Sequence, residues 1–549
     1  MKRGTWRTGQ RVRDAARRRA ASRGGVLVRW RRGFVLVIVL VVVAMLALAA
    51  YTFAGLMGTH YGAAKLGGRQ LQTRLLVESG IEKIRMYLLM DDAARMESGG
   101  HFNNPSIFQA VPVLMHNDAT QRGDFSVLVS NLDDDGNLAG VRYGLEDEST
   151  RLNINAMVTI DGIAENAGRD LLMALPGMTE DVADAILDWM DEDDEPREYG
   201  AESSYYQTLK PPYYAKNGPL DTVEELLLVR GVTPPLLFGT DLNRNGMVDP
   251  HETAAGTTSA TSGTQMTTQS VDTSMGSMDR GWSGYLTLCG AEKNVSSTGA
   301  PRIDLNGDDL ETLYENLCTV LNEDWAKFII LYRQNGASES TSPSDDISAA
   351  GELDLTKEGG NKFTQVLDLV GAKVEVPASG GGEAKVIGPV FPETIAEMIV
   401  YMPVLMDNVA VNAQPTIPGR ININQAPRAI LMGIPGLEDT VVEQILEQRT
   451  YESTSEAEAA ARQHETWLMT SGIVTLDEMK KLVPFICAGG DVFRAQVVGY
   501  YEDGGAACRA EVIFDATGAV PSVLSFRDIS HLGRGYPLDM LGVQMSNNY

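Results

Sequence analysis

The feature that most constrains this chain is an unbroken apolar run near its start. Every residue from Phe34 to Ala50 is apolar, and the run continues to Met57 with few polar residues. As a helix, this length crosses roughly 30 Å of hydrocarbon. Twelve Lys/Arg residues and a single acid, Asp14, precede the run. By the positive-inside rule, the sequence therefore predicts one membrane span with a cytoplasmic N-terminus.

The charge reverses beyond this span. The whole chain has a formal net charge of −27, whereas the twelve basic residues and one acid before Gly33 give +11, so the remainder carries −38. An acidic body outside the membrane argues against nucleic acid as a partner and is compatible with divalent cations. The predicted compartment, outside the cytoplasm, also permits disulfides between the four cysteines, Cys289, Cys318, Cys487 and Cys508. Sequence proximity favours the pairs 289–318 and 487–508, although three connectivities, or buried thiols, remain open.

Three interpretations of the N-terminal stretch compete. A plain anchor or a cleavable signal peptide is the commonest meaning of a basic segment before an apolar one. Arg31-Arg32-Gly33-Phe34 also fits a twin-arginine signal loosely, and Ala47-Leu48-Ala49 could serve a signal peptidase. A prepilin signal would instead be cleaved between Gly33 and Phe34. Apolar residues at helical spacing from Leu71 to Leu88, after an expected break near 55–68, predict a second, amphipathic helical part. A helix of this length resembles the pilin and pseudopilin design, which favours the prepilin interpretation.

Strand patterns occur at both ends of the remaining chain. Alternating apolar residues around the turn at 131–136 predict a hairpin over 124–146. The alternation returns in Val492–Tyr501, in Arg509–Phe514 and in Ser522–Phe526. We therefore predict one small α+β domain, whose antiparallel sheet is interrupted by a large, mainly helical insertion.

The insertion contains an internal repeat. The pattern Arg–aliphatic–Asn/Asp–aliphatic–Asn occurs at 151–155, 302–306 and 420–424, and each copy is expected to be extended and to end in a helix cap. Capping boxes are predicted at Thr222…Glu225 and at Thr475…Glu478. Ser/Thr/Gly-rich or polar linkers separate these units.

Two Pro-Gly segments align without a gap and resemble helix-hairpin-helix motifs. ALPGMTEDVADAILDW begins at Ala174, and GIPGLEDTVVEQILEQ begins at Gly433. Such motifs bind DNA by presenting backbone N–H groups and nearby basic residues to phosphates. Here Glu180-Asp181 and Glu438-Asp439 follow the turns, and carboxylates repel phosphate. We therefore favour a helical packing module over DNA binding.

The clearest chemical motif is an EF-hand-like loop from Asp241 to Glu252. Calcium requires six to eight hard oxygens around a tight turn, and the loop spacing supplies them. Gly246 occupies the sixth position, at which EF-hand loops turn sharply. The alternative is an Asx-rich turn without an ion. The predicted ligands are Asp241, Asn243, Asn245, Met247 (through its backbone carbonyl), Asp249 and Glu252.

A second acidic cluster follows the first Pro-Gly segment. Carboxylates at this density repel one another unless they bind a cation or are fully solvated. A solvated loop is the default interpretation, and a second calcium site is the alternative. The candidate ligands are Asp188, Asp191, Asp193, Asp194 and Glu202.

The sequence gives no candidate catalytic residue. The six histidines are scattered without metal-ligand spacing, and no nucleophile elbow, P-loop or dinucleotide-binding glycine pattern is present. We therefore expect a protein that is not an enzyme.

A family resemblance is carried mainly by residues 188–231. The segments Asp188-Trp-Met-Asp-Glu-Asp-Asp-Glu-Pro196, Gly200-Ala-Glu-Ser-Ser-Tyr-Tyr206, Pro211-Pro-Tyr213, Asn217-Gly-Pro-Leu220 and Glu224-Glu-Leu-Leu-Leu-Val-Arg-Gly231 resemble general secretion pathway protein K, the large minor pseudopilin of type II secretion. The resemblance implies a prepilin leader, cleavage between Gly33 and Phe34, and N-methylation of Phe34 by prepilin peptidase. It also implies an inner-membrane anchor, a periplasmic globular part, bound calcium, and the minor pseudopilins I and J as partners at the pseudopilus tip. Major pseudopilins carry Glu at the fifth mature position, where this chain has Ile38, and the K family shares that absence.

The resemblance and the residue patterns together predict the organisation and the function. We expect a minor pseudopilin that initiates or caps the pseudopilus for protein export across the outer membrane. The alternative is a membrane-anchored periplasmic calcium-binding scaffold or adhesion protein. The predicted segments are a leader (1–33), a transmembrane segment (34–57), the first part of the pseudopilin domain (58–147), a first helical domain with the EF-hand-like loop (148–252), a linker (253–280), a central insertion (281–410), a second helical domain (411–486) and C-terminal pseudopilin strands (487–549).

Overall fold

The computed structural model describes residues 32–133, 135–247, 249, 252, 280–340, 344–377, 384–449 and 460–543. The chain forms two compact units, Met1–Gly68 and Arg69–Tyr549. Most of the predicted leader and nearly all of the predicted linker at 253–280 lie outside the described residues. The predicted domain boundaries therefore stay predictions.

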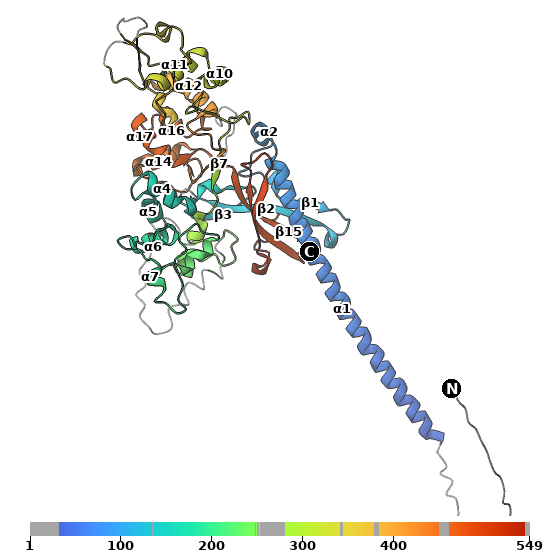
Figure 1. The fold of residues 1–549 in the computed structure, drawn as a ribbon. Coiled ribbons are helices and arrows are strands. Elements are labelled where there is room, and N and C mark those ends of the chain that lie inside the picture. Colours follow the sequence, from blue (N-terminus) through green and yellow to red (C-terminus); the bar gives the residue numbers. More distant parts are fainter. Residues whose placement is uncertain are drawn as a thin grey trace, which may run out of the picture. The chain divides into compact units, whose positions relative to one another are not determined.

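A single long helix, α1, runs from Arg32 to Leu88 (Figure 1). The predicted break near 55–68 is wrong, because Gly55, Gly58, Gly62, Gly67 and Gly68 all lie inside this helix. Glycine costs a helix about 1 kcal/mol per residue relative to alanine, and the remaining residues of this 57-residue helix outweigh that cost. The long N-terminal apolar helix is thus confirmed as one element.

The main sheet is antiparallel and combines strands from both ends of the chain. The strand order is β1-β2-β15-β16-β17, with β3 paired to β2 and β4 paired to β15. The predicted hairpin and the predicted C-terminal strands are therefore confirmed, and β2 and β15 join them side by side. The strands are β1 (Val111–Leu114), β2 (Gly123–Leu132), β3 (Leu138–Arg142), β4 (Glu146–Asp147), β15 (Val492–Tyr501), β16 (Ala507–Asp515) and β17 (Ser522–Asp528).

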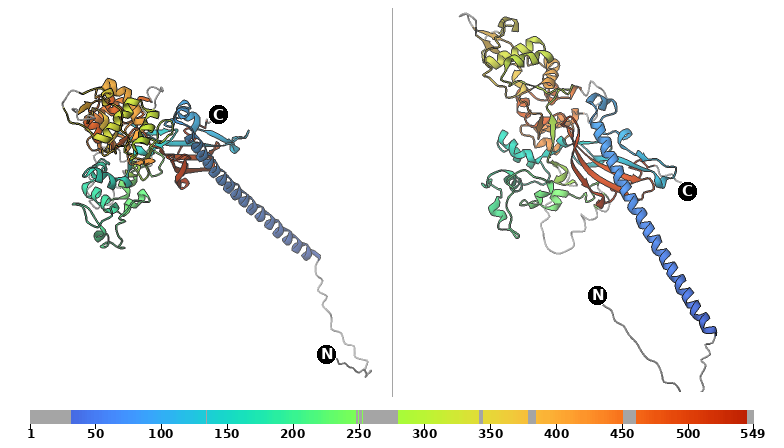
Figure 2. Two further views of the ribbon diagram at one scale, coloured as in Figure 1. Left: turned by 45° about the horizontal axis from the view of Figure 1, so that its top comes forward. Right: turned by 45° about the vertical axis from the view of Figure 1, so that its right-hand side comes forward.

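The second half of α1 packs on one face of this sheet, and the strands stay beside it in both further views (Figure 2). Val77, Ile81 and Ile84 of the helix form one buried cluster with side chains of β2, β15 and β16. The helix approaches closely at Gly80, where a Cβ would lie 2.5 Å from Cγ1 of Val497. The spacing of buried residues follows the helical period predicted for this segment.

The C-terminal residues pack against the sheet in a second, smaller cluster. Tyr536 and Leu541 contact Leu128 of β2 and Tyr500 of β15. The Tyr500 hydroxyl donates to the carbonyl of Leu541 at 2.6 Å. These contacts attach the last described segment of the chain to the sheet.

The residues between β4 and β15 form the mainly helical insertion. Its buried apolar side chains, from Leu152 to Ile486, make one continuous core. The structure thus contains mixed helices and an antiparallel sheet, as the predicted α+β class requires.

The helices lie before, within and after the insertion. Before the insertion lie α2 (Asp92–Glu97), α3 (Pro105–Phe108) and η1 (Ala119–Gln121). The described helices between the strands β4 and β15 are η2 (Glu148–Thr150), η3 (Ile154–Ala156), α4 (Met157–Ile163), α5 (Ala167–Met173), α6 (Glu180–Met190), α7 (Ser203–Tyr206), η4 (Val223–Leu228), α8 (Pro234–Phe238), η7 (Trp282–Gly284), α10 (Leu310–Val320), α11 (Glu323–Asn335), η8 (Ile347–Ala350), η9 (Val366–Leu369), α12 (Ile395–Asn408), α13 (Arg428–Met432), α14 (Asp439–Gln448), α16 (Trp467–Thr470) and α17 (Leu476–Leu482), and η10 (Ser530–Leu532) follows the sheet.

Each copy of the internal repeat forms a two-residue parallel bridge. The first repeat pairs β5 with β6, the second pairs β8 with β11, and the third pairs β13 with β14. The remaining short strands pair as β7 with β12 and β9 with β10. The short strands are β5 (Leu152–Asn153), β6 (Leu286–Thr287), β7 (Ala291–Lys293), β8 (Ile303–Asp304), β9 (Val374–Val376), β10 (Lys385–Ile387), β11 (Val409–Ala410), β12 (Thr416–Pro418), β13 (Ile421–Asn422) and β14 (Ile486–Cys487).

The final asparagine of each repeat does not cap a helix, contrary to the prediction. Asn155 instead exchanges two hydrogen bonds with the backbone of Leu220, and Asn306 does the same with Phe363. Asn424 donates to the carbonyls of Arg462 and Ala488. The side-chain amide can donate and accept at once, so these residues tie remote loops to the bridges.

The two Pro-Gly segments have the same local form. In each, a glycine with positive φ, Gly177 or Gly436, lies in the turn between two helices, α5 and α6 or α13 and α14. Their identity as helix-hairpin-helix motifs stays a prediction. The capping box at Thr475 is confirmed, whereas Thr222 precedes a 3-10 helix and makes no side-chain cap.

Candidate functional site

The predicted processing site lies at the start of α1. Gly33 is the second residue of the helix, and Phe34, the expected mature N-terminus, is 58% exposed. Among the described residues, one helix, Phe34–Leu88, is long and apolar enough to cross a membrane, and its most apolar stretch contains no buried side chain. An exposed apolar surface of this size requires lipid or other apolar partners.

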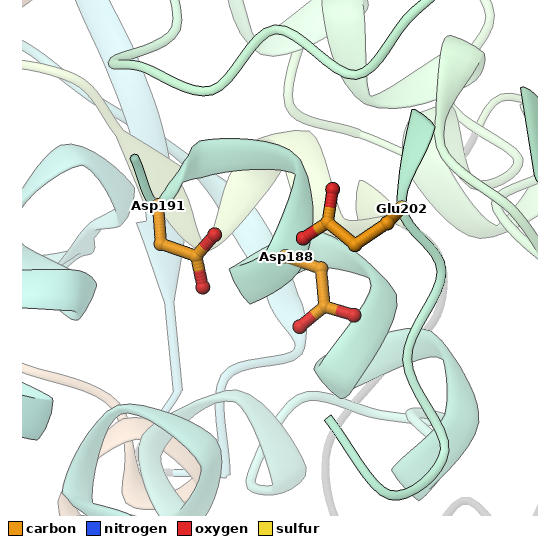
Figure 3. A group of neighbouring side chains, drawn as sticks. All are labelled: Asp188, Asp191 and Glu202. Atoms are coloured by element: carbon orange, nitrogen blue, oxygen red, sulfur yellow. The ribbon is translucent and has the colours of Figure 1, made fainter. Parts of the chain in front are cut away.

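Three carboxylates of the predicted acidic cluster converge at the end of α6. Asp188 lies on this helix, Asp191 immediately follows it, and Glu202 comes from the segment that leads into α7 (Figure 3). One oxygen from each side chain lies within 4.8 Å of the other two. The apolar face of α6 is buried in the core, so the helix carries Asp188 into the interior with it. Asp188 and Glu202 are almost completely buried, and the side chain of Asp191 is 12% exposed.

A single arginine offsets part of this negative charge. Arg197 donates from Nη1 to Asp188 at 2.9 Å and to Asp191, and its Nη2 lies 3.5 Å from Asp161. Both carboxylate oxygens of Glu202 are buried and have no hydrogen-bond partner. Burial, together with the charges of Asp188 and Asp191, raises the pKa of Glu202 to about 7. Such a carboxylate needs either a proton or a cation.

Not every predicted ligand joins this cluster. Asp193 and Asp194 are exposed and belong to the neighbouring loop. Asp193 accepts a hydrogen bond from the backbone of Glu195, and Asp194 accepts one from the amide of Asn217. Their position in the same acidic run made them indistinguishable from the buried pair by sequence alone.

Two residues that the sequence analysis missed shape the cluster. Arg197 holds two of the carboxylates, and its signal is a lone basic residue in an acidic run. Gly200 allows the chain to pass close to Asp188, because a Cβ there would lie 1.8 Å from Oδ2 of Asp188. Glycine is therefore the residue type that fits this position.

The EF-hand-like loop turns around Asp241. Its carboxylate accepts backbone hydrogen bonds from Asn245 at 3.1 Å and from Gly246 at 2.9 Å. Gly246 has a φ of +73°, which the sharp turn at this position requires. The backbone of Met247 donates to Oδ1 of Asn245 at 2.9 Å. Burial, as the largest cause, raises the pKa of Asp241, and the charge of Glu252 adds to it.

The other predicted loop ligands also face one another. Asp249 Oδ2 accepts hydrogen bonds from the amides of Asn243 at 2.7 Å and Asn245 at 3.1 Å. Glu252 accepts from the backbone of Asn243 at 3.2 Å and of Asp249 at 2.9 Å. Oδ1 of Asn243 is buried and has no hydrogen-bond partner. The described loop residues thus carry the oxygen-bearing side chains that a hard divalent cation prefers, and most of these oxygens accept hydrogen bonds from within the loop.

This loop is fastened to the main sheet. Gln496 of β15 donates to the carbonyl of Arg244 at 2.6 Å, and Arg509 of β16 donates to the carbonyl of Asn243. The amide of Asn245 also donates to the carbonyl of Gly535 at 2.8 Å. The loop therefore connects the helical insertion to the strands.

The predicted disulfides are not present in the structure, which holds all four cysteines as free thiols. Cys487 is buried in β14, whereas Cys508 lies in β16 and accepts a hydrogen bond from the hydroxyl of Ser530 at 3.2 Å. Cys289 is half-buried beside Thr287, and Cys318 is exposed on α10. Neither pair that sequence proximity favoured is joined in the structure, and Cys487 and Cys508 lie on different strands, β14 and β16.

Comparison with known proteins gives a consistent result. Residues 150–238 match the family model described as "Type II secretion system (T2SS), protein K". This segment contains the acidic cluster, and the EF-hand-like loop begins just after it. The match therefore covers part of the helical insertion.

Two curated proteins are similar to parts of this chain. The putative type II secretion system protein K of Escherichia coli K12 is 34% identical over 115 residues, which are 18% of this chain and 33% of that protein. Type II secretion system protein K of Klebsiella pneumoniae is 25% identical over 206 residues, which are 38% of this chain and 60% of that protein. The chain thus spans about a third and three fifths of the lengths of these two relatives.

A solved structure is similar at low identity. It is the GspK-GspI-GspJ complex from the type II secretion system of enterotoxigenic Escherichia coli, in which the matched chain is 12% identical. The match covers 85% of this chain and 99% of that chain, with a TM-score of 0.35. A TM-score this low does not establish a common fold.

Proposed function

We propose that this chain, a relative of type II secretion protein K, is a minor pseudopilin that initiates or caps a type II secretion pseudopilus. The match of residues 150–238 to the protein K model carries the proposal. The apolar helix α1 and the antiparallel sheet packed on its second half support it, because a pseudopilin needs a membrane-inserted helix joined to a small globular domain. The role is structural, so the protein is not an enzyme.

The proposal includes processing by prepilin peptidase. Cleavage between Gly33 and Phe34 removes the basic leader and leaves Phe34 as an N-methylated terminus. The exposed apolar face of α1 then anchors the chain as a single span in the inner membrane. The basic residues before Gly33 keep the leader cytoplasmic, and the acidic body is periplasmic.

Calcium is the proposed structural cofactor at two places. Asp188, Asp191 and Glu202 would hold one ion, since Glu202 has two buried oxygens without a partner. The EF-hand-like loop at 241–252 would hold the second ion. Calcium supplies positive charge that neutralises the clustered carboxylates and fixes their loops. The helix-hairpin-helix-like segments act as packing modules, because Glu180 and Asp439 occupy the first turns of α6 and α14.

The proposed partners are the minor pseudopilins I and J of the same secretion system. The test deletes the gene for this chain and measures protein export across the outer membrane. Export should be lost, and the full chain should restore it, whereas a Gly33→Glu variant that blocks leader cleavage should not. I and J should also co-elute with the detergent-extracted wild-type chain.

Normal export in the deletion strain, together with no co-elution of I and J, would contradict the pseudopilin role. Two further results would each contradict part of the proposal. One is full restoration of export by the Gly33→Glu variant, and the other is salt-sensitive DNA binding by the purified protein. The first result would remove leader cleavage as a requirement. The second would show that the Pro-Gly segments are more than packing modules.

A further inference from the structure

The helix α12 is apolar on its outer side as well as on its inner side. The inner side buries Met398, Met402 and Leu405, each at most 4% exposed. The ring of Tyr401 packs against that of Phe391, with 5.3 Å between centroids, and α12 also packs against α16 (Figure 1). A helix that is apolar on both sides is normally covered on both sides.

The outer side of α12 carries two parallel rows of apolar side chains. Val400 is 70% exposed, Ile399 is 55% exposed and Ile395 is 47% exposed. Within the described part of the chain, the two rows are therefore largely uncovered. Side chains four residues apart stand in a row on a helix, and a groove separates adjacent rows. The members of one row are Ile395, Ile399 and Pro403, and those of the other are Ala396, Val400 and Val404.

A second helix fits such a groove. Rows with this spacing on two helices interdigitate in the commonest class of helix packing, in which the axes cross at about 50°. From Ile395 to Pro403 the rows extend about 12 Å along the axis, at 1.5 Å per residue. A helix offers no strand edge with which an extended segment could pair. The surface of α12 therefore favours a helical occupant.

Pro403 adds a polar point to the outer side. Proline has no N–H, so Pro403 cannot donate the regular hydrogen bond to the carbonyl of Ile399, one turn earlier in the helix. Both residues are exposed, so this carbonyl lies on the outer side of α12. A basic side chain of an arriving helix could donate to it, because lysine and arginine carry only donors.

The charged residues at the start of α12 are acidic. Glu397 lies in the first turn and Glu393 lies just before the helix, and both are exposed. Burial raises the pKa of Tyr401, and the charges of Glu397 and Glu393 add to this effect, so both carboxylates lie near its ring. No lysine or arginine occurs in residues 386–419. Two carboxylates thus border the apolar rows at this end.

The other end of α12 does not offset this charge. Arg302 donates there to the backbone carbonyl of Asp407 at 3.3 Å, so one positive and one negative side chain balance. The helix α16 has no charged residue. The body beyond the basic leader is strongly acidic, so a second copy of the chain and an anionic lipid surface would both be repelled. A basic occupant is therefore favoured.

We infer that the outer side of α12 binds an amphipathic helix of a second protein, in which lysine or arginine flanks the apolar stripe. The stripe would enter the groove between the rows that contain Ile399 and Val400. The basic side chains would pair with Glu393 and Glu397, and one would donate to the carbonyl of Ile399. This surface is separate from the candidate cation sites, and the inference does not rest on the pseudopilin role.

The experiment uses the full-length protein in nanodiscs of phosphatidylcholine and a fluorescein-labelled helical peptide of eighteen residues. The peptide has leucines along one face and lysines on both sides of them, and a matched peptide has glutamate in place of lysine. Empty nanodiscs give the background of binding to lipid. Fluorescence anisotropy should show saturable binding of the lysine peptide and at least tenfold weaker binding of the glutamate peptide.

Variants then locate the site. Ile399→Asp and Val400→Asp each place a charge in the apolar rows and should weaken binding of the lysine peptide at least tenfold. Glu397→Lys should weaken binding of the lysine peptide and strengthen binding of the glutamate peptide. Val320→Asp changes an exposed valine at the end of α10 and should leave both affinities unchanged. Circular dichroism establishes that each variant is folded, and Val400→Ser replaces Val400→Asp if the latter is not.

Three results would overturn the inference. The first is equal binding of the two peptides to the wild type, and the second is wild-type binding of the lysine peptide by folded Val400→Asp. The third is a dimer of the detergent-extracted protein in sedimentation that Val400→Asp abolishes, since this would assign the surface to a second copy of the chain. A preference for the lysine peptide that Val400→Asp removes and Val320→Asp retains supports the inference.

Discussion

The two candidate cation sites of this chain are built in opposite ways. The acidic cluster takes Asp188, Asp191 and Glu202 from α6 and from a separate segment, and it places them in the protein interior. The candidate ligands of the EF-hand-like loop fall within twelve consecutive positions, and the amides of Asn243 and Asn245 already donate to the carboxylate of Asp249. The cluster is thus short of positive charge and hydrogen-bond donors, whereas the loop is largely satisfied by itself.

The difference teaches where an ion matters most for stability. Buried carboxylates without partners oppose folding until they are neutralised. A loop whose oxygens accept internal hydrogen bonds can keep its turn without a cation. Calcium should therefore stabilise the fold mainly through the cluster and only secondarily through the loop.

The largest effect is expected for Asp188→Ala. In saturating calcium this variant should lose about 3 kcal/mol of unfolding free energy, because an ion at a hundredfold excess over its Kd contributes about 2.7 kcal/mol. Urea denaturation with and without EGTA measures the change, and the loss should fall by more than half in EGTA. Asp193→Ala, in the exposed loop beside the cluster, is the matched control and should cost less than about 0.5 kcal/mol. An equal loss with and without calcium would contradict an ion at this site.

The cluster should also make stability depend on pH. The pKa of Glu202 is about 7 in the folded chain, against 4.5 for an ordinary glutamate. The folded state therefore binds this proton more tightly, and its stability without calcium should fall by roughly 2 kcal/mol as the pH rises from about 4.5 to 7. Asp147 and Glu292 also have raised pKa values in this range, so the measured quantity is the difference between the wild type and Glu202→Gln. Identical pH profiles for the two proteins would refute this prediction.

A smaller effect is expected from crowding the cluster. Gly200→Ala places a methyl group against Asp188 and should cost about 1.5 kcal/mol. It should also weaken calcium binding about tenfold in calorimetric titration. Gly218→Ala is the matched control, because its nearest neighbouring atom would lie 3.9 Å from the new Cβ. Unchanged calcium affinity in Gly200→Ala would show that the close approach is unimportant for the site.

The smallest effect is expected in the loop. Asp249→Asn keeps the volume of the side chain but loses charge-assisted hydrogen bonds from two asparagines, and it should cost about 1 kcal/mol in EGTA. Calorimetry should show loss of one calcium site and an unchanged cluster site. Asn217→Ala, whose amide bonds the exposed loop at Asp193 and Asp194, serves as the control for losing an asparagine contact. Loss of both calcium sites in Asp249→Asn would show that the loop and the cluster do not bind calcium independently.

The same contrast explains what the sequence could predict. Local patterns predicted the strands β2, β15, β16 and β17 and the spacing of the loop at 241–252, because alternation and turn geometry depend on neighbouring residues. The cluster depends on long-range placement. Asp188 and Glu202 come together only because α6 packs with its apolar face in the core and the chain returns at Gly200.

The wrong predictions follow the same rule. The last asparagines of the repeats were expected to cap the next helix, but each bonds a remote segment, such as Leu220 for Asn155. The cysteine pairs were inferred from sequence proximity, and the fold places Cys487 and Cys508 on different strands. Helix α1 is continuous through the glycines at 55–68, four of which lie beyond the predicted membrane segment at 34–57, so glycine content alone did not predict where the helix would break.

The most direct test of the pseudopilin role is the identity of the mature N-terminus. Intact-mass measurement and N-terminal peptide sequencing of the membrane-extracted chain would determine it. The pseudopilin role predicts a start at Phe34 that carries one additional methyl group. A start near Ala50, or an uncut leader, would contradict that role and would favour a membrane-anchored calcium-binding scaffold.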